Sequence, residues 1–558
     1  MKLRWLFIVT VVIAICSFPS HWYPTSVRLQ FAKLFGASDY QSSPASMLMP
    51  MPEIIDEACE EDIAGWRKQQ TIESVTIEKS STCVADNPYA IAAFVRGTNN
   101  VSDHVLHQSG LTPDSIEKHS DLDGDGDPDM IHIRLEVVEL NGISPESNDP
   151  TTQFSIAPGI MPGFWVFAPK HFGMATKNFE SAESRALLRA PSPSIRIEQG
   201  DQVQITLENS HYMPHTIHFH GVDHSFVDSQ GEGNDGVPIA SEIPVLPGKS
   251  RTYEMQPRNS GTKFYHCHVQ PHVHVMMGLQ GMFVIEENKS NNWVQTLNIG
   301  AGKIRSPSVA SKELYDSEYD LHYMDIDADL NNRVQKFNDV RLITKSMHRE
   351  YNITDATQDY YILNGRSFPY TFQESLITVK PDQKIKLRIA NGGRESLAFH
   401  THGHNVTITH RDGNLSPQAA QFIRDVVFIA PAQRIDLDLD TKNDGLHSYG
   451  EGVWLFHDHQ YKGVTTNGIG PGGHISAIVY QEYLQDNGWP KTLGVGWNKY
   501  FTQEYYRKEQ PVWESYSPSL FSDTETNKFL LARLVIFSMS LSAMLIVLIT
   551  IIISPRRW

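Results

Sequence analysis

The sequence predicts a mainly β protein built from two β-sandwich domains, with an extra region before them and a transmembrane helix after them. Three observations carry this prediction. Short runs of alternating apolar and polar residues begin at residue 131. A run of this kind, followed by a histidine motif, occurs once in each half of the chain. Helical periodicity is scarce until a final apolar segment near the C-terminus.

Length and charge restrict the class of protein. The 558 residues are enough for two to four domains, and a hydrophobic content of 40% is typical of a globular chain. The formal net charge of -17 argues against nucleic acid as a partner and slightly favours small cations.

The N-terminal region is predicted to begin with a signal peptide at residues 1–20. Lys2 and Arg4 precede an apolar run that ends near Phe18, as in secretory signals, although no clean cleavage site follows and an uncleaved anchor remains open. Residues 45–128 have no recognisable motif. Within them, Cys59 and Cys83 are close enough in sequence to form a disulfide, which suits an exported protein.

An acidic loop ends this region. Every second residue of the loop is an aspartate, and the residues between them are a leucine, two glycines and a proline. The aspartates are Asp121, Asp123, Asp125, Asp127 and Asp129. Several carboxylate oxygens aimed at one centre suit calcium, a hard cation. His132 stands where an EF-hand loop requires Glu, so a solvated acidic turn is the alternative to a calcium site.

Domain 1 is predicted over residues 129–288. Residues 131–140, 194–207 and 281–286 alternate as half-buried strands do, and the turn signals Gly200-Asp and Pro247-Gly separate them. Residues 289–360 form a long connection that includes part of the first strand of the next unit.

Domain 2 is predicted over residues 361–485, because Leu376-Ile-Thr-Val-Lys-Pro-Asp matches Ser194-Ile-Arg-Ile-Glu-Gln-Gly-Asp in position before a His-x-His motif. Residues 486–528 are expected to be a stalk and 530–554 a transmembrane helix, since the chain from Leu534 to Ser554 is uncharged and long enough to span a bilayer. Together with an export signal, this predicts a single-pass cell-membrane protein with extracytoplasmic domains.

Four histidine clusters carry the chemistry. Residues two apart in a strand point to the same face, so each His-x-His motif aims two imidazoles at one site. Repeated imidazole pairs suit a cluster of copper ions. The clusters contain His215, His218 and His220; His266, His268 and His272; His400, His402 and His404; and His457 and His459.

Cys267 lies inside the second cluster and predicts a different kind of site. One thiolate, two imidazoles and a weak thioether make a blue-copper centre, which carries electrons one at a time. The candidates are Cys267, His272, Met277 and His215. Because His266 and His268 flank the thiolate, an electron would have a short covalent path into the copper cluster.

The sequence resembles the multicopper oxidase family between about residues 129 and 485. The resemblance rests on His215-Thr-Ile-His-Phe-His-Gly, Asp235-Gly-Val-Pro, Gly261-Thr-Lys-Phe-Tyr-His-Cys-His, and the downstream His272 and Met277. It implies a cupredoxin-like Greek-key β-sandwich for each domain and four copper ions per active unit.

The resemblance also implies the copper ligands. It assigns a type 1 copper to His215, Cys267, His272 and Met277, and a type 2 copper to His218 and His400. It assigns the type 3 copper pair to His220, His266, His268, His402, His457 and His459. Cys267, His272 and Asp235 would be catalytic, with Asp235 relaying protons; a turn-capping role is the alternative for Asp235. His224, His274 and His404 match no ligand position and are expected to be supporting or surface residues.

Domain 2 departs from a type 1 site. Leu397, Asp458 and Gly463 stand where His, Cys and His would be required. In this it resembles the two-domain, laccase-like branch with type 1 copper in the first domain alone. That branch implies a closed homotrimer in which domain 1 of one subunit meets domain 2 of its neighbour.

The predicted function is a multicopper oxidase that oxidises an external donor at the type 1 copper and reduces dioxygen to water at the cluster. The donor stays open between a phenol, a metal ion and an electron-carrier protein. One alternative is a copper nitrite reductase, which has no use for a second His after Cys267 or for His457 and His459. The other is a non-enzymatic copper-binding protein, which leaves the electron-transfer ligand set unexplained.

Overall fold

A computed structural model describes residues 115–144, 150–170, 188–304 and 314–508, except residues 291, 293, 295, 486, 487 and 493–496. It also describes the paired strands β1 (Gln70–Ile72) and β2 (Val75–Ile77). The predicted signal peptide, the pair Cys59 and Cys83, and the transmembrane helix at 530–554 lie outside these residues. Within them, no helix has the length and apolar character needed to cross a bilayer.

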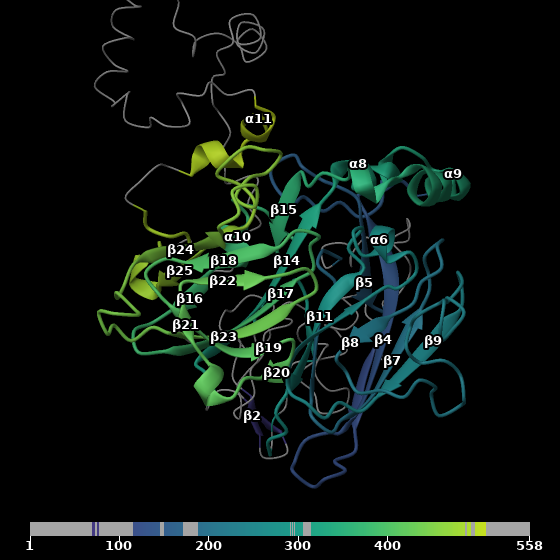
Figure 1. Ribbon diagram of the computed structural model, residues 1–558, viewed down its shortest axis with the longest axis horizontal. Helices are drawn as coiled ribbons and strands as arrows, with labels where there is room; N and C mark the ends of the chain where they lie inside the picture. The colour runs from purple at the N-terminus through teal and green to yellow at the C-terminus, as the bar shows by residue number, and fades with distance from the viewer. Residues whose placement is uncertain are drawn as a thin grey trace, which may run out of the picture. The chain divides into compact units, whose positions relative to one another are not determined.

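Domain 1 contains two sheets whose apolar faces share one core (Figure 1). One sheet has the order β3 (Ile116–His119), β4 (Met130–Leu140), β7 (Gln202–Glu208) and β9 (Ser250–Met255), with β5 (Phe164–Pro169) paired to β4. The other has the order β12 (Leu297–Asn298), β6 (Ser194–Glu198), β11 (Gln280–Glu286), β10 (Gly261–His266) and β8 (His218–His220). β3 lies before the predicted boundary at residue 129, and the acidic loop joins it to β4.

Domain 2 repeats the plan with a larger first sheet. That sheet has the order β13 (Gly302–Lys303), β14 (Ser317–Ile326), β17 (Lys384–Asn391), β23 (Arg434–Asp440), β19 (Val406–Arg411) and β20 (Asn414–Leu415), with β15 (Tyr360–Leu363) on β14 and β21 (Ile423–Arg424) on β19. The second sheet has the order β16 (Ile377–Val379), β25 (Ile475–Tyr480), β24 (Val453–Asp458), β18 (Leu397–Thr401) and β22 (Val426–Ile429).

The pairing of the strands confirms the mainly β fold and the internal repeat. In domain 1, β6 runs parallel to β11 and β4 runs parallel to β7. In domain 2, β16 runs parallel to β25 and β14 runs parallel to β17. The two runs matched in the sequence are β6 and β16, so they occupy equivalent places. β7 alternates between buried and less buried residues, as the sequence pattern predicted.

The connection between the domains contains all of β14 and a helical segment after it. After β14 come α8 (Ala328–Asn331), η4 (Asn332–Gln335), α9 (Val340–Lys345) and the π-helix η5 (Ser346–Glu350). We call residues 328–350 the cap. The side chains of Asp327 and Asp339 accept backbone N–H bonds and start α8 and α9. Leu330, Val334, Ile343 and Met347 of the cap are fully buried in the domain 1 core.

The remaining helices are short. They are α6 (Pro271–His274), η6 (Ile353–Asp355), α10 (Thr371–Glu374), η7 (Gln418–Ala420), η8 (Gln481–Tyr483), η9 (Asn498–Phe501) and α11 (Gln503–Tyr506). In Figure 1, α6 lies between the domain 1 strands and the cap helices α8 and α9.

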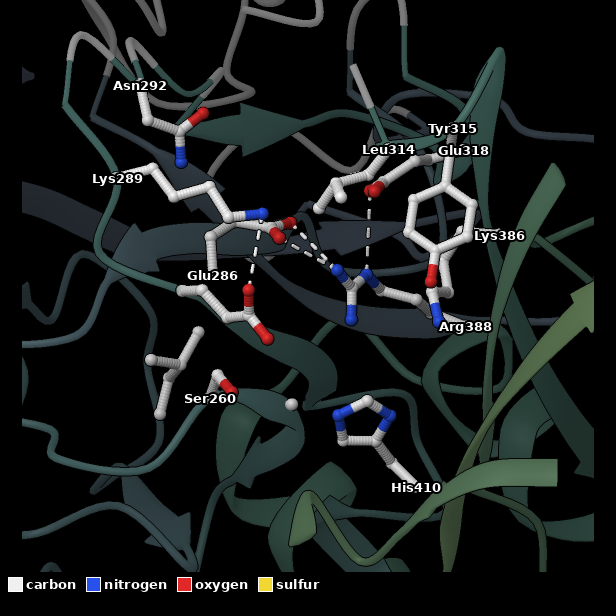
Figure 2. A pocket seen from close by; sticks show the side chains of 13 residues that line it. Ser260, Glu286, Lys289, Asn292, Leu314, Tyr315, Glu318, Lys386, Arg388 and His410 are labelled. Atoms are coloured by element: carbon white, nitrogen blue, oxygen red, sulfur yellow. Dashed lines mark hydrogen bonds and ion pairs between the residues drawn. The ribbon is translucent and has the colours of Figure 1, made fainter. Parts of the chain in front are cut away.

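A buried network of ion pairs joins domain 1 to domain 2. Arg196 on β6 pairs with Asp320 on β14 at 2.8 Å. Arg388 on β17 pairs with Glu286 on β11 at 2.8 Å and with Asp436 on β23 at 3.0 Å. Figure 2 shows Arg388 pointing toward Glu286 and Glu318 at the edge of a small pocket. The side chains of Arg196 and Arg388 are only 3% and 6% exposed, so each charge depends on its partners.

Candidate metal centre

Strand register brings the domain 1 histidines together. His218 on β8 lies directly opposite His266 on β10, and His220 lies two residues further along the same face of β8. The rings of His220 and His266 are 4.9 Å apart, and their Nε2 atoms approach to 2.8 Å. The ring of His268, just beyond the end of β10, lies 5.4 Å from that of His218.

Domain 2 builds the same arrangement. His400 on β18 lies directly opposite His457 on β24. His402 approaches His457 with 3.1 Å between the two Nε2 atoms, and the ring of His459 lies 5.3 Å from that of His400. The structure therefore contains two equivalent groups of four imidazoles. Among the residues that the structure describes, every ring contact between these histidines stays within one domain.

Backbone carbonyls orient four of these imidazoles through Nδ1. His218 bonds to the carbonyl of Asp235 at 2.7 Å and His266 to that of Cys267 at 2.9 Å. In domain 2, His400 bonds to the carbonyl of Asp425 at 3.0 Å and His457 to that of Asp458 at 2.9 Å. A histidine that donates from Nδ1 keeps its Nε2 lone pair, which is the atom available to a metal ion.

Burial keeps the facing imidazoles neutral. Burial first, and then the neighbouring imidazoles, lower the pKa of His220 to about 3 and the pKa of His266 to about 4. Burial likewise lowers the pKa of His402 and of His457. Neutral imidazoles are metal ligands, whereas imidazolium ions are not.

A third group of side chains surrounds Cys267, the residue that follows β10. The Sγ atom of Cys267 is 3.7 Å from Nδ1 of His215 and 3.4 Å from Nδ1 of His274. All three side chains have 0% exposure, and Met277 is fully buried in the same core. Burial raises the pKa of the Cys267 thiol to about 12, so the thiolate forms when a metal ion replaces its proton.

In the structure His274, and not the His272 that the sequence predicted, faces the thiol. Pro271 starts the one-turn helix α6, in which residues two apart point to nearly opposite sides. His274 consequently faces the thiol, and His272 is exposed. The position of His272 five residues after Cys267 could not reveal this helical turn. In the structure the neighbouring Val273 and Met277 are buried, which shows that α6 packs against the core.

Two further histidines that the sequence did not single out support this group. Nδ1 of His211 lies 2.9 Å from Nε2 of His215, and Nε2 of His348 lies 3.2 Å from Nε2 of His274. Trp165 packs edge-on against the rings of His211, His215 and His274 at 5.0, 6.1 and 5.2 Å. Such outer contacts hold ligand rings in one orientation.

Asp235 lies beside the domain 1 imidazoles. Its Oδ1 atom is 3.1 Å from Nε2 of His224 and 3.3 Å from Nδ1 of His218. The side chain is 29% exposed, so solvent reaches it. His404, by contrast, is a core residue whose Nε2 bonds to the hydroxyl of Tyr480 at 2.9 Å.

Domain 2 has a hydrogen-bonded carboxylate where domain 1 has the thiol. Asp458 is buried, and its Oδ1 atom accepts bonds from the backbone N–H groups of Ala398 and Gln460 at 3.0 Å each. A Cβ on Gly463 would lie 2.2 Å from Oδ2 of Asp458, so no larger residue fits there. Leu397 is also buried. These three residues therefore supply neither a thiol nor an imidazole at the place that corresponds to the Cys267 group.

The acidic loop brings three of its five carboxylates together. Ligand atoms of Asp121, Asp123 and Asp129 lie within 4.8 Å of one another. Asp127 turns inward instead and accepts a bond from the backbone N–H of Asn292 at 2.9 Å. Burial, followed by the charge of Asp127, raises the pKa of Asp125 to about 7.

Two segments of the chain match two family models that carry the same description. The description "Multicopper oxidase" applies to both matches, at residues 188–290 and 337–462. The chain is 28% identical over 282 residues to the iron transport multicopper oxidase FET3 of Saccharomyces cerevisiae, covering 49% of this chain and 37% of the yeast protein. It is 33% identical over 112 residues to Laccase-3 of Botryotinia fuckeliana, covering 20% of this chain and 23% of that protein.

The comparison with solved structures gives partial matches. The blue copper oxidase from Nitrosomonas europaea has a TM-score of 0.47 and 24% identity, covering 68% of this chain and 93% of that structure. The matched segments span only 37% and 45% of the FET3 proteins of Saccharomyces cerevisiae and Kluyveromyces lactis.

Proposed function

This chain belongs to the multicopper oxidase family, and on that premise we propose that it couples one-electron oxidation of an external donor to the reduction of dioxygen to water. The donor class is a phenol or a metal ion, with an electron-carrier protein as a further candidate. When bound, copper supplies the redox chemistry, and the protein supplies ligands, orientation and proton transfer.

The side chains present fit copper. Two imidazoles and a thiol converge within 4.8 Å, with a buried thioether in the same core, which is the donor set of a type 1 site. We assign that site to His215, Cys267, His274 and Met277. We assign a type 2 copper to His218 and His400, and the type 3 pair to His220, His266, His268, His402, His457 and His459.

The continuity of residues 266–268 carries the proposal. The thiol of Cys267 faces the His215 group, while His266 and His268 on either side of it face the imidazole group of domain 1. One short peptide segment thus links an electron-accepting site to a site suited to several metal ions. This link supports an oxidase over a protein that only binds copper.

A copper nitrite reductase is the rival enzyme. It needs one type 1 and one type 2 copper, and no type 3 pair. Here His220 and His266 place their Nε2 atoms face to face, and so do His402 and His457. Two such pairs are ligands for additional metal ions, which favours the oxidase.

We further propose that the complete copper cluster forms between subunits, in a closed homotrimer. The two imidazole groups make no ring contact with each other within one chain. Exposed apolar side chains adjoin the domain 2 group, since Val426 lies opposite His400 and the ring of Tyr461 lies 6.0 Å from that of His459. Such exposed apolar side chains are typical of a surface that another subunit covers, and domain 1 has exposed ones as well. They are Ile239 and Ile243 in domain 1, and Val426, Phe428 and Tyr461 in domain 2.

The proposed location is the cell membrane, with the β domains outside the cytoplasm. This proposal rests on the sequence, which predicts a signal peptide at residues 1–20 and a transmembrane helix at residues 530–554. Fractionation of the full chain, with protease protection of either terminus, tests the location and the orientation.

Copper counting with an oxygen electrode tests the function. We expect four coppers per chain, a blue charge-transfer band and oxygen uptake with a phenol or a reduced metal ion. The variant Cys267→Ser should lose the blue band and the uptake together. Two coppers per chain with nitrite turnover would indicate the reductase, and retention of both signals in Cys267→Ser would refute the assignment.

A further inference from the structure

The outer edge of His274 is covered. Its Nδ1 atom faces Cys267, so its Nε2 atom is the edge that points away from the thiol. That atom lies 3.2 Å from Nε2 of His348, and the two rings stack at 5.2 Å with 28° between their planes. Because His274 has 0% exposure, an external molecule cannot touch it directly.

The other imidazole at Cys267 is closed off more completely. Nε2 of His215 meets His211, which is itself buried with 4% exposure. Beyond His211 lies the carboxylate of Glu139, 3.9 Å away and also buried, which accepts a bond from Nε1 of Trp165 at 2.9 Å. This side ends in the protein core.

His348 therefore connects the group around Cys267 to the protein surface. It is half-buried, and no hydrogen bond or ion pair engages its Nδ1 atom within the part of the chain that the structure describes. We propose that His348 is the residue that an external electron donor contacts, and that electrons reach the site of Cys267 through the His348–His274 contact. The inference rests on the proposed function.

The cap is built to hold His348 in this place. His348 lies on the π-helix η5, a rare element that often marks functional positions. Its neighbour Met347 is fully buried in the domain 1 core. The guanidinium of Arg333 donates to the carbonyl of Ser346 at 2.6 Å and ties the start of η5 to η4. These contacts fix η5, and the imidazole ring of His348 therefore stays in contact with His274.

The step moves one electron. A small donor, such as a phenol or a reduced transition-metal ion, is oxidised by one electron, and copper(II) at the Cys267 site is reduced to copper(I). A phenol releases its proton to water, and His348 is unchanged at the end. The single free imidazole edge suits a small donor that makes one hydrogen bond or one coordinate bond.

Separate measurement of the two half-reactions tests this role. The blue band of the copper-loaded full chain is bleached anaerobically with hydroquinone and then restored with oxygen, both by stopped flow. His348→Leu should slow bleaching at least about tenfold and leave reoxidation unchanged, because the path from Cys267 to the cluster is intact. Arg349→Gln, an exposed neighbour on the same turn, is the matched control and should behave as the unsubstituted chain.

Two outcomes overturn the proposal. One is an unchanged bleaching rate in His348→Leu. The other is a lower reduction potential of the Cys267 site in His348→Leu, by about 59 mV for each tenfold decrease in the bleaching rate. In that case His348 would only tune the potential of the site. If His348→Leu does not take up copper, His348→Gln keeps a hydrogen-bonding group and gives the same comparison. Absence of a blue band in the unsubstituted chain would instead refute the proposed function.

Discussion

His274 places its Nδ1 atom 3.4 Å from the Sγ atom of Cys267, seven residues earlier in the chain. His272, five residues after Cys267, is exposed on the opposite side of the one-turn helix α6. The tertiary structure and the spacing of the sequence motif thus favour different histidines as the copper ligand.

Substitution of each histidine decides between them. We expect His274→Ala to abolish the blue charge-transfer band and donor oxidation, because a buried ligand next to the thiol is lost. We expect His272→Ala to keep both. Visible absorption and copper content of the two purified variants give the answer, and loss of the blue band in His272→Ala alone would restore the sequence-based assignment.

Mixed oligomers test whether the cluster forms between subunits. His266→Ala removes a ligand of domain 1 and His457→Ala removes one of domain 2, so each variant alone should be inactive. Co-expression should restore about a quarter of the sites, those that combine an intact domain 1 of one chain with an intact domain 2 of another. Oxygen uptake measures the recovery. A cluster within one chain would show none, because every chain carries one lesion.

Asp235 is expected to matter for turnover rather than for copper binding. Asp235→Asn keeps the size of the side chain but removes the carboxylate that touches His224 and His218. We expect turnover to fall about 10- to 100-fold with the blue band unchanged. Glu232→Gln, an exposed carboxylate in the same loop, is the control. Lower stability with unchanged turnover per copper would indicate a turn-capping role instead.

The ion network between the domains predicts a large effect on stability. Arg388→Met removes one of the two guanidinium groups that pair with buried Glu286, and the guanidinium group that pairs with buried Asp436, which costs about 3–5 kcal/mol. Thermal and urea unfolding should show the loss. Arg341→Gln breaks an exposed pair with Asp339 and should leave the unfolding midpoint unchanged. Equal midpoints for both variants would mean that the network contributes little.

Calcium is expected to stabilise the acidic loop. Asp121, Asp123 and Asp129 converge, so calcium should raise the thermal midpoint of the chain relative to a chelator. The double variant Asp121→Asn and Asp123→Asn should lose this response. Asp316→Asn, a carboxylate outside the loop, serves as the control. A thermal midpoint that is the same with calcium and with chelator would identify the loop as a solvated acidic turn.

Local periodicity explains how much of the site could be predicted. The pairs His218 and His220, and His400 and His402, share a face because strands repeat every two residues. The sequence contains that information directly. It also shows that Asp458 replaces the thiolate in domain 2, and the hydrogen bonds of Asp458 explain how the fold accommodates the change.

The sequence by itself determined the repeated β-sandwich, the imidazole pairs and the lone thiol, because these depend on residue type and on short spacings. Tertiary structure decided which histidine faces Cys267, since a single helical turn after Pro271 reverses the direction of a side chain within two residues. It also decided that the cap covers His274 with His348, 74 residues away in the chain. No local pattern encodes such a contact, because it forms only when the cap packs into the core of domain 1.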